Sequence, residues 1–357
     1  MGNKILGITD FILFSLIVLI SIFGLILLYS ATNQDIDAVI KQGTKLIFCF
    51  SLMLLIGSIN INKLKYLTPY IYLLCLIFLI VTLFWGHDLK GAKRWIIFYG
   101  FSLQISEILK IIVPMMIAWY ISNYDDKEIG LKKLIISFII IFIPIVFIVK
   151  QPDLGTSLII LLCGLITLFL SGVKNSHIKY LVGLFLIVTP MMWKFFLLPY
   201  QKQRIMTLIE PASDPLGSGY HIIQSKIAVG SGGFSGKGFL NGTQSQLEFL
   251  PERGTDFIFA VFAEEFGFFG ILILFSVYLA IIIRCINITT RAKKYYAKIL
   301  AGSITSIFII LILTNISMTI GLLPVVGVTL PLLSLGGSAL LSVFIAFGIM
   351  FSINRRS

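Results

Sequence analysis

Carboxylates gather in one short stretch of this chain, beside one of its most apolar runs. Residues 247–265, LEFLPERGTDFIFAVFAEE, contain five of the sixteen acidic residues. Asp256 stands where a polar segment gives way to an apolar run, so the dipole of a starting helix would stabilise it. Glu264 and Glu265 would lie about 12 Å further along that helix, where carboxylates need cations or hydrogen-bond donors. We therefore expect Glu264 and Glu265 to line a polar interior as cavity residues.

Asp256 also has the surroundings of a general base. The segment before it carries five cations: Lys202, Arg204, Lys226, Lys237 and Arg253. A carboxylate at a hydrated helix end, close to such cations and above a polar cavity, suits proton abstraction in a reaction on an anionic substrate. The spacing of these residues indicates this chemistry but does not identify the substrate.

A second pair of charges stands inside an apolar run. In QISEILKIIVPMM, Glu107 and Lys110 are one helical turn apart and can pair with each other. One interpretation is a self-neutralising pair that lets the helix insert into a membrane. The other is the wall of a polar cavity, with a bend at Pro114. Asp153, in KQPDLGTS, is interpreted from its position alone as the cap of a following helix.

The stretch VGSGGFSGKGFLNGT, residues 229–243, contains six glycines and one lysine. It is not a Walker A loop, because Ser231 replaces the first glycine and Gly238 follows Lys237 in place of Ser or Thr. It is not a dinucleotide-binding turn either, because no strand precedes it and its third glycine comes one residue late. A compact, turn-rich loop is the favoured interpretation, and an anion site made by backbone N–H groups is the alternative.

The elements that must hold these residues are membrane-spanning helices. Hydrophobic residues make up 58% of the 357 positions and the mean hydropathy is +1.00, far above a soluble domain of this length. A helical span needs about 20 apolar residues. We therefore expect an all-α integral membrane protein whose first span is a retained helix, because a signal-peptide cleavage site is missing. Ten apolar runs meet or approach the length of a span: 11–30, 45–59, 66–86, 104–122, 132–150, 156–172, 178–198, 257–283, 298–321 and 333–353.

Lysine and arginine set the expected orientation. With the N-terminus in the cytoplasm, the inner loops and ends carry fifteen of these cations and the short outer loops carry six. Both termini are therefore expected in the cytoplasm, and the long segment 199–256, between the seventh and eighth spans, is expected outside. Residues 1–357 then form one membrane domain, and the aromatic residues of 199–256 predict that this segment folds back onto the bundle. The formal charge of +12 follows from this topology, and no basic stripe of a nucleic-acid-binding domain is present.

Metal ligands and disulfides are not indicated by the sequence. Neither a CxxC pair nor a histidine spacing typical of zinc is present. A structural or catalytic zinc is therefore not expected. The cysteines fall in or at the ends of expected spans and the histidines lie in separate loops: Cys49, Cys75, Cys163, Cys285, His87, His177 and His221.

The motifs together resemble one known family. Residues 202–270, from KQRIM to FGFFG, with GAKRW, QISEILK, KQPDLGTS and GLLPVVGVTLPLLSLGGSAL, closely resemble the shape, elongation, division and sporulation (SEDS) family of bacterial peptidoglycan glycosyltransferases. The resemblance covers nearly the whole chain, in the family's order. GTQSQLEFLPE with LPVVGV is similar to the elongation members rather than the division members. Gly254, Thr329 and Leu335 depart from commoner residues of the family, which affects the substrate contacts expected there.

The resemblance implies an inverting polymerase of lipid II, the undecaprenyl-pyrophosphate-linked disaccharide pentapeptide. Asp256 matches the catalytic aspartate, which would deprotonate the acceptor 4-hydroxyl while undecaprenyl pyrophosphate leaves. Glu107 and Lys110 match the family's buried ion pair beneath the cavity. The further substrate-binding residues expected from the motifs, charge and location are Arg94, Arg204, Lys237 and Asp153.

The resemblance also implies partners and a location. A class B penicillin-binding protein transpeptidase would pack its single membrane helix on the bundle and stimulate polymerisation, as part of the elongation machinery in the bacterial cytoplasmic membrane. A divalent cation, Mg²⁺ or Mn²⁺, would be an optional aid in binding pyrophosphate. Two other classes stay open from the residues alone: a flippase for lipid II, and a non-catalytic scaffold for a partner enzyme. The division-specific paralogue is the alternative within the family.

Overall fold

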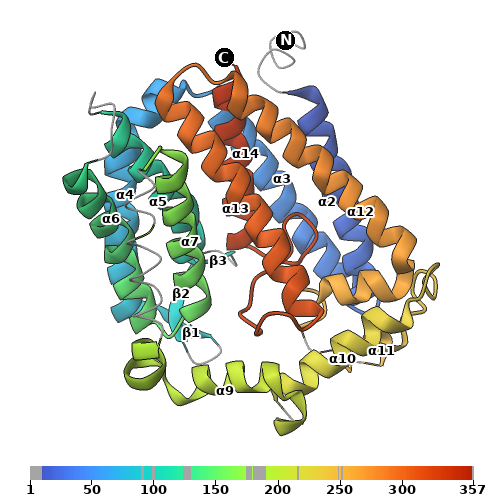
Figure 1. The fold of residues 1–357 in the computed structure, drawn as a ribbon. Coiled ribbons are helices and arrows are strands. Elements are labelled where there is room, and N and C mark those ends of the chain that lie inside the picture. The colour runs from blue at the N-terminus through green and yellow to red at the C-terminus, as the bar shows by residue number, and fades with distance from the viewer. Residues whose placement is uncertain are drawn as a thin grey trace.

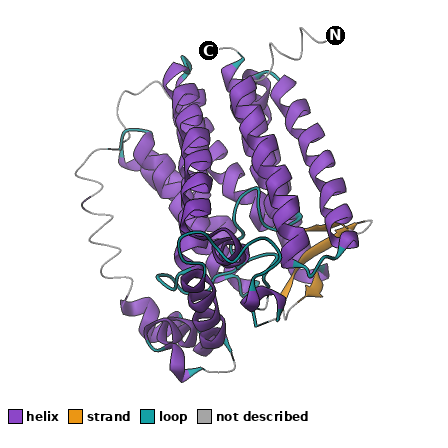
Figure 2. Ribbon diagram, turned by 90° about the vertical axis from the view of Figure 1, so that its right-hand side faces the viewer, coloured by secondary structure: helices purple, strands orange, loops and turns teal. Residues whose placement is uncertain are grey.

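The described part of the chain forms a bundle of helices with one small three-stranded sheet (Figure 1, Figure 2). The computed structural model describes residues 10–89, 92–98, 101–123, 130–173, 179, 190–214, 217–247, 249–250 and 252–355. Two shorter apolar helices are α7 (Leu154–Leu170) and α14 (Ser338–Asn354). Seven helices in the described part are long and apolar enough to cross a membrane: α2 (Phe11–Ala31), α3 (Ile36–Ser58), α4 (Ile61–Trp85), α5 (Ile105–Ser122), α6 (Leu131–Lys150), α12 (Ile258–Arg291) and α13 (Tyr295–Thr319).

These nine helices correspond to nine of the ten spans that the sequence predicts. The seventh expected span, 178–198, lies largely outside the described residues, and its described end contains the π-helical turn η1 (Met192–Phe196). The number and apolar composition of these helices indicate a multi-pass membrane protein.

Polar caps explain where several helices begin. The side chains of Asp10, Asp35, Asn60 and Asp153 accept hydrogen bonds from backbone N–H groups in the first turns of α2, α3, α4 and α7. Such caps satisfy donors that a helix start leaves unpaired. Asp153 accepts from the Thr156 N–H at 3.1 Å, so the capping interpretation of this residue is confirmed.

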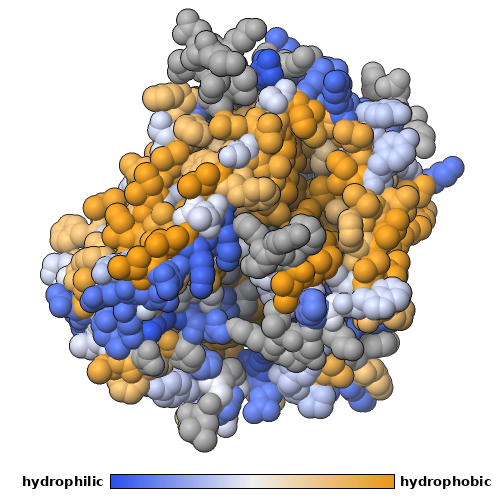
Figure 3. All heavy atoms as spheres, turned by 180° about the vertical axis from the view of Figure 1, so that it is seen from behind, coloured by the Kyte–Doolittle hydropathy of each residue, from blue (hydrophilic) through white to orange (hydrophobic). Residues whose placement is uncertain are grey.

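Apolar side chains cover the outside of the helices as well as their contacts. α14 packs along α3, α12 along α13 and α4 along α5, and α5 is the most buried of the seven long helices. Ile47, Tyr66 and Ile139 are examples of large hydrophobic side chains that stay exposed on α3, α4 and α6. Figure 3 shows apolar residues across much of one face, with polar residues gathered toward its ends. A lipid bilayer is the environment in which such a surface is stable.

Residues 320–337, called the central loop below, join α13 to α14 through the middle of the bundle (Figure 1, Figure 2). The sequence predicts a span over 333–353, but α14 begins only at Ser338. The prediction is wrong for 333–337 because these residues form irregular backbone rather than a helix, with Leu333 and Ser334 buried and the next three residues half-buried. Irregular backbone is tolerated at membrane depth where protein surrounds it.

Two glycines let the central loop approach the helices around it. A Cβ atom added to Gly24 of α2 would lie 2.8 Å from the Leu332 carbonyl oxygen. A Cβ atom added to Gly155 of α7 would lie 2.7 Å from the Val326 carbonyl oxygen. The loop is therefore held between α2 and α7 at distances that other residues at these two positions would prevent.

The eighth expected span, 257–283, is not one continuous helix. α12 changes direction at Gly267, whose φ of 62° and ψ of −162° lie outside the helical region (Figure 1). Two helical segments result, 258–266 and 268–291. The prediction of one continuous span is wrong here because apolar length alone does not reveal a glycine in a conformation that other residues rarely adopt.

The glycine-rich stretch fills the break in α12. Two N–H groups of α12 after the break donate to carbonyl oxygens of the glycine-rich stretch. Two N–H groups of the stretch donate to carbonyl oxygens of α12 before the break. Every backbone group in this exchange regains the kind of partner that the helix would have supplied. The four hydrogen bonds are Phe268 N to Gly233 O (2.9 Å), Phe269 N to Phe234 O (3.1 Å), Lys237 N to Glu264 O (3.0 Å) and Gly238 N to Glu265 O (3.0 Å).

Glycine is required in this stretch by close approach of the two backbones. A Cβ atom added to Gly232 would lie 2.0 Å from the Ala263 carbonyl oxygen, and one added to Gly236 would lie 2.1 Å from the Glu265 carbonyl oxygen. The favoured interpretation of the stretch as a compact, turn-rich loop is therefore confirmed. Its N–H groups at 237 and 238 point at peptide carbonyls rather than at an anion site.

Segment 199–256 packs on one end of the bundle, as its aromatic residues predict. α10 lies against α12 and α13, and α9 crosses the same end (Figure 1). We call this end of the molecule the loop end. The elements of the segment are α9 (Pro199–Ile209), the 3-10 turn η2 (Pro211–Ser213), α10 (Ser218–Ser231) and α11 (Thr243–Gln246).

A small antiparallel sheet connects α4 to α5, and the sequence reasoning did not predict it. Its strands are β1 (His87–Leu89), β2 (Ala92–Phe98) and β3 (Phe101–Leu103), in the order β1-β2-β3. Strands this short carry little periodic signal. The sheet matters for the site because β2 carries Arg94.

The break at Gly267 yields a stability prediction. Gly267→Ala should destabilise the fold by about 1 to 3 kcal/mol, because alanine is strained at this backbone conformation and its Cβ would lie 2.3 Å from the Gly236 nitrogen. The midpoint of thermal unfolding in detergent measures the effect. Gly43→Ala in α3 is the matched control, because a Cβ atom there has no neighbour within 4 Å. An unchanged midpoint for Gly267→Ala would contradict the break.

Candidate active site

Asp256 lies in the turn before α12, half-buried at the loop end. The backbone just before it is tied to the central loop: the Leu335 N–H donates to the Gly254 carbonyl at 2.8 Å, and the Ser334 hydroxyl donates to the Thr255 carbonyl at 2.6 Å. Its carboxylate faces Gly327, where an added Cβ atom would lie 3.7 Å from Oδ2. The candidate general base is therefore held against the central loop.

A histidine of α10 adjoins this turn. The His221 ring lies 6.2 Å from the ring of Phe257, the residue after Asp256. Burial lowers the pKa of His221 below its usual range, against the opposing effect of the Asp214 and Glu252 carboxylates. A neutral imidazole adds no positive charge to the surroundings of Asp256 at neutral pH.

Arg94 and Asp153 form an ion pair across the same end. The Arg94 guanidinium lies 3.0 Å from Asp153 Oδ2, with side chains 23% and 8% exposed. The Gln104 amide donates to the same oxygen at 2.9 Å. Asp153 thus caps α7 and also orients a partly exposed guanidinium, which the capping interpretation alone did not include.

Arg204 reaches the central loop from α9. Its guanidinium donates to the Val325 carbonyl at 3.2 Å and lies 5.9 Å from the centre of the Tyr200 ring. The Tyr200 hydroxyl in turn donates to the Pro152 carbonyl at 3.3 Å. α9 therefore bridges the turn that carries Asp153 and the loop that faces Asp256.

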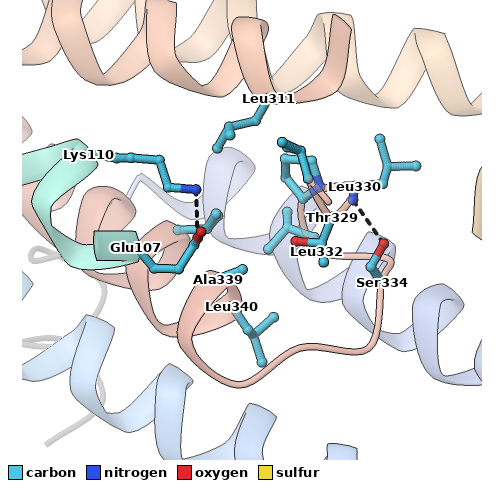
Figure 4. A pocket seen from close by; sticks show the side chains of 12 residues that line it. Glu107, Lys110, Leu311, Thr329, Leu330, Leu332, Ser334, Ala339 and Leu340 are labelled. Atoms are coloured by element: carbon cyan, nitrogen blue, oxygen red, sulfur yellow. Dashed lines mark hydrogen bonds and ion pairs between the residues drawn. The ribbon is translucent and has the colours of Figure 1, made fainter. Parts of the chain in front are cut away.

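Glu107 and Lys110 pair beneath the central loop. Lys110 Nζ lies 2.6 Å from Glu107 Oε2, and their side chains are only 5% and 12% exposed, in that order, so the predicted pairing is confirmed. Both side chains also line a pocket whose other wall is made by residues 328–332 and Ser334 (Figure 4). The cavity-wall interpretation of this pair thus agrees with its position. Asp256 is not among the residues that line this pocket.

The structure brings four of the predicted features together around the central loop. Asp256 faces Gly327, Arg204 contacts residue 325, and the Glu107–Lys110 pair lies under residues 328–334. The Arg94–Asp153 pair lies beside them, because Gly155 in the first turn of α7 contacts Val326. A carboxylate and two partly exposed guanidinium groups at one end of a membrane bundle can bind an anion and accept a proton beside it.

Lys237, Glu264 and Glu265 form a separate cluster at the break in α12. Glu264 Oε1 accepts from Lys237 Nζ at 2.7 Å and from the Thr243 hydroxyl and the Gln244 N–H at 3.0 Å each. Glu265 accepts from the Ser30 hydroxyl of α2. One oxygen of each carboxylate therefore has the expected partners.

The prediction that Glu264 and Glu265 line a polar interior needs correction. The two residues are 0% and 1% exposed and are enclosed by the glycine-rich stretch, because α12 breaks just after them. Lys237 is likewise engaged by Glu264 and Thr243 in this structure, rather than by the groups around the central loop. The cluster fixes the loop on the helix.

Sequence reasoning missed the buried polar side chains that hold the site. Asn315 of α13, Gln104 before α5, and Ser334 and Ser338 around the central loop are all buried and all bond to its surroundings. The sequence could have indicated such a residue, because burying an amide such as Asn315 within an apolar run is costly unless the amide has hydrogen-bond partners.

The Lys237–Glu264 pair yields a second stability prediction. Lys237→Met should destabilise the protein by about 3 to 5 kcal/mol, because it leaves a buried carboxylate without its cation. Lys237→Met combined with Glu264→Gln should be clearly less destabilised than Lys237→Met alone, since the amide carries no charge. Thermal unfolding of the single and double variants in detergent measures the coupling. Strictly additive losses would show that the two side chains do not form the pair.

Comparison with known proteins places the chain among related sequences. The FTSW_RODA_SPOVE family, described as cell cycle protein, matches residues 5–357. The peptidoglycan glycosyltransferase MrdB of Escherichia coli (strain K12) is 45% identical over 333 residues, which cover 93% of this chain and 90% of that protein. The probable peptidoglycan glycosyltransferase FtsW of Francisella salina is 35% identical over 348 residues, which cover 93% of this chain and 86% of that protein.

A solved structure extends the similarity to the fold. It was reported as "Structural coordination of polymerization and crosslinking by a peptidoglycan synthase complex", and it matches with a TM-score of 0.84 at 26% identity over 97% of each chain. Because the family match spans nearly the whole chain and the sequence relatives are similar over most of their length, this chain belongs to the FTSW_RODA_SPOVE family, the SEDS family that its motifs resemble.

Proposed function

We propose that this protein is a peptidoglycan glycosyltransferase that polymerises lipid II into β-1,4-linked glycan strands. The observation that carries the proposal is the Asp256 carboxylate held against the central loop, with the guanidinium groups of Arg94 and Arg204 around the same loop. The similarity to MrdB and to a chain of a peptidoglycan synthase complex supports the substrate class.

In the proposed reaction Asp256 acts as the general base. It removes the proton of the acceptor GlcNAc 4-hydroxyl, and that oxygen attacks C1 of the donor MurNAc. The C1–O4 bond forms as the bond from C1 to the pyrophosphate oxygen breaks, and undecaprenyl pyrophosphate leaves with the electron pair. Attack from the opposite face inverts C1 and gives the β linkage. Pyrophosphate is stable as an anion, so the leaving group needs cations rather than a general acid.

Arg94 and Arg204 supply those cations in the proposal. Both side chains keep exposed surface while one part of each is fixed, by Asp153 and by the Val325 carbonyl. A guanidinium that is oriented but keeps free donors suits a phosphate group. Lys237 contributes through the loop that it fixes with Glu264.

The Glu107–Lys110 pair forms the polar floor of the site in this proposal. It lines a pocket together with residues 328–332, which directly follow Gly327, the residue that the Asp256 carboxylate faces. Because each charge neutralises the other, the pair can stay buried in the bundle and still provide polar groups to the pocket.

A divalent cation such as Mg²⁺ or Mn²⁺ would depend mainly on the substrate for ligands. The described residues contain no group of three or more His, Cys, Asp or Glu side chains that could hold a metal ion. Magnesium is commonly bound by one or two carboxylates together with substrate phosphates. Such an ion would therefore bind together with the pyrophosphate.

The site's place in the cell follows from the proposed topology. Ten spans, both termini in the cytoplasm and segment 199–256 outside the bacterial cytoplasmic membrane agree with the distribution of lysine and arginine. The start of α2 and the end of α14 lie at one end of the molecule, opposite the loop end (Figure 1). Asp256 would then meet lipid II at the outer membrane surface.

A class B penicillin-binding protein transpeptidase is the proposed partner, which would cross-link the strands. The structural neighbour comes from a complex that couples polymerisation and cross-linking. An elongation role, in maintaining cell shape, is favoured over division by the 45% identity to MrdB against 35% to the FtsW relative.

The proposal predicts the behaviour of Asp256→Asn. Purified protein with its transpeptidase partner should polymerise labelled lipid II, and Asp256→Asn should slow this by about 100- to 10,000-fold, because the amide cannot take the proton. Glycan strands resolved on a gel measure the rate. Glu210→Gln, a carboxylate-to-amide change at an exposed position of the same segment, is the matched control and should keep wild-type activity.

Two outcomes would contradict parts of the proposal. Normal strand synthesis by Asp256→Asn would place the base elsewhere. An inactive wild type in a folded, partner-bound preparation would favour transport of lipid II or a scaffold role. Co-purification of the transpeptidase with Asp256→Asn is expected to persist, since the amide has nearly the same size and shape as the carboxylate.

A further inference from the structure

Asn315 is a fully buried polar side chain near the end of α13, and the proposed reaction gives it no part. It is 0% exposed. Its amide nitrogen donates to the Asp256 carbonyl oxygen at 2.9 Å and to the Val328 carbonyl oxygen at 2.7 Å. Burying an amide N–H without a hydrogen-bond acceptor is unfavourable, and these two acceptors offset that cost for both N–H groups.

One acceptor lies on the backbone that carries the candidate base, and the other lies on the backbone that the base faces. One is the carbonyl of Asp256 itself. The other is the carbonyl of Val328, which follows Gly327, the residue that the Asp256 carboxylate faces. A single amide group therefore fixes both the residue that carries the carboxylate and the backbone opposite that carboxylate.

Asn315 is itself held in place from the loop end. Its carbonyl accepts from the Thr319 hydroxyl one turn later, and the Thr319 carbonyl accepts from the Ser225 hydroxyl of α10 at 2.8 Å. Ser225 and Thr319 are both 0% exposed. The last turns of α13 therefore provide a fixed point, tied to segment 199–256, from which the amide reaches the site.

We propose that Asn315 is a positioning residue that sets the place and direction of the Asp256 carboxylate relative to the central loop. A general base has to lie within about 2.6 to 3.2 Å of the oxygen whose proton it takes. A shift of about 1 Å can cost about a hundredfold in rate even when substrate still binds. Asn315 touches no substrate, since it is fully buried, and it acts through Asp256. The inference rests on the proposed function.

The test compares Asn315→Asp and Asn315→Ser with wild type in lipid II polymerisation. Asn315→Asp keeps the size but sets an oxygen against two carbonyl oxygens, and Asn315→Ser keeps one donor on a shorter side chain. Turnover should fall by about 10- to 100-fold for Asn315→Asp and less for Asn315→Ser. The KM for lipid II should change far less than turnover, because the cations that bind the pyrophosphate are untouched.

Thr68→Val is the matched control for a lost buried hydrogen bond on α13. Thr68 is 0% exposed and lies 3.1 Å from the Tyr296 hydroxyl at the opposite end of that helix. This variant should lose a similar amount of thermal stability and keep wild-type turnover. A loss of turnover in Thr68→Val equal to that in Asn315→Ser would overturn the inference, because general loosening of α13 would then explain both.

The outcomes separate the inference from the proposed function. If Asp256→Asn is inactive while Asn315→Asp and Asn315→Ser keep wild-type turnover, the positioning role is wrong and the base remains. If Asp256→Asn polymerises normally, the proposed base is wrong, and with it the role of Asn315. A raised KM with unchanged turnover in the Asn315 variants would also overturn the inference, because substrate binding would then be what they impair.

Discussion

The break in α12 at Gly267 is the constraint on which the rest of the structure depends. A helix interrupted inside an apolar bundle leaves backbone N–H and carbonyl groups without partners, and in lipid each such group costs several kcal/mol. Residues 233–238 supply the missing partners: two carbonyl oxygens accept from the two N–H groups after the break, and two N–H groups donate to the two carbonyl oxygens before it. Segment 199–256 is therefore bound to the bundle through the backbone of α12. The short helical segment 258–266, which starts after Asp256, is fixed at its end by the same hydrogen bonds.

The central loop follows the same physical rule. Its irregular backbone lies among helices, and buried polar side chains bond to it: Asn315 of α13 donates to the Val328 carbonyl, and Ser334 within the loop accepts from the Leu330 N–H. This arrangement lets polar groups accumulate where a membrane bundle would otherwise exclude them. The Glu107–Lys110 pair is buried below the loop, while Arg94 and Arg204 lie beside it with exposed surface. A site for an anionic, lipid-linked substrate can form there without unpaired charge in the bilayer.

The parts of this fold that depend on local chemistry could be predicted from the sequence, and those that depend on distant contacts could not. Apolar length identified the spans, and a three-residue spacing identified the Glu107–Lys110 pair. The break at Gly267 escaped prediction because its stability comes from residues about thirty positions earlier in the chain. The helical reading of 333–337 failed for a similar reason, since hydrophobicity does not distinguish a buried loop from a helix. An amide within an apolar run, as at Asn315, indicates a buried hydrogen-bonded side chain because burial without partners is costly. The identity of its partners became known only from the structure.

The most direct measurement of the central claim is a structure of this protein with its transpeptidase partner and two molecules of a non-reacting lipid II analogue. The account predicts that the acceptor 4-hydroxyl oxygen lies within about 3.2 Å of an Asp256 carboxylate oxygen. It also predicts that the donor pyrophosphate contacts Arg94 or Arg204. An acceptor hydroxyl bound by another carboxylate, with Asp256 out of reach of both sugars, would contradict the account.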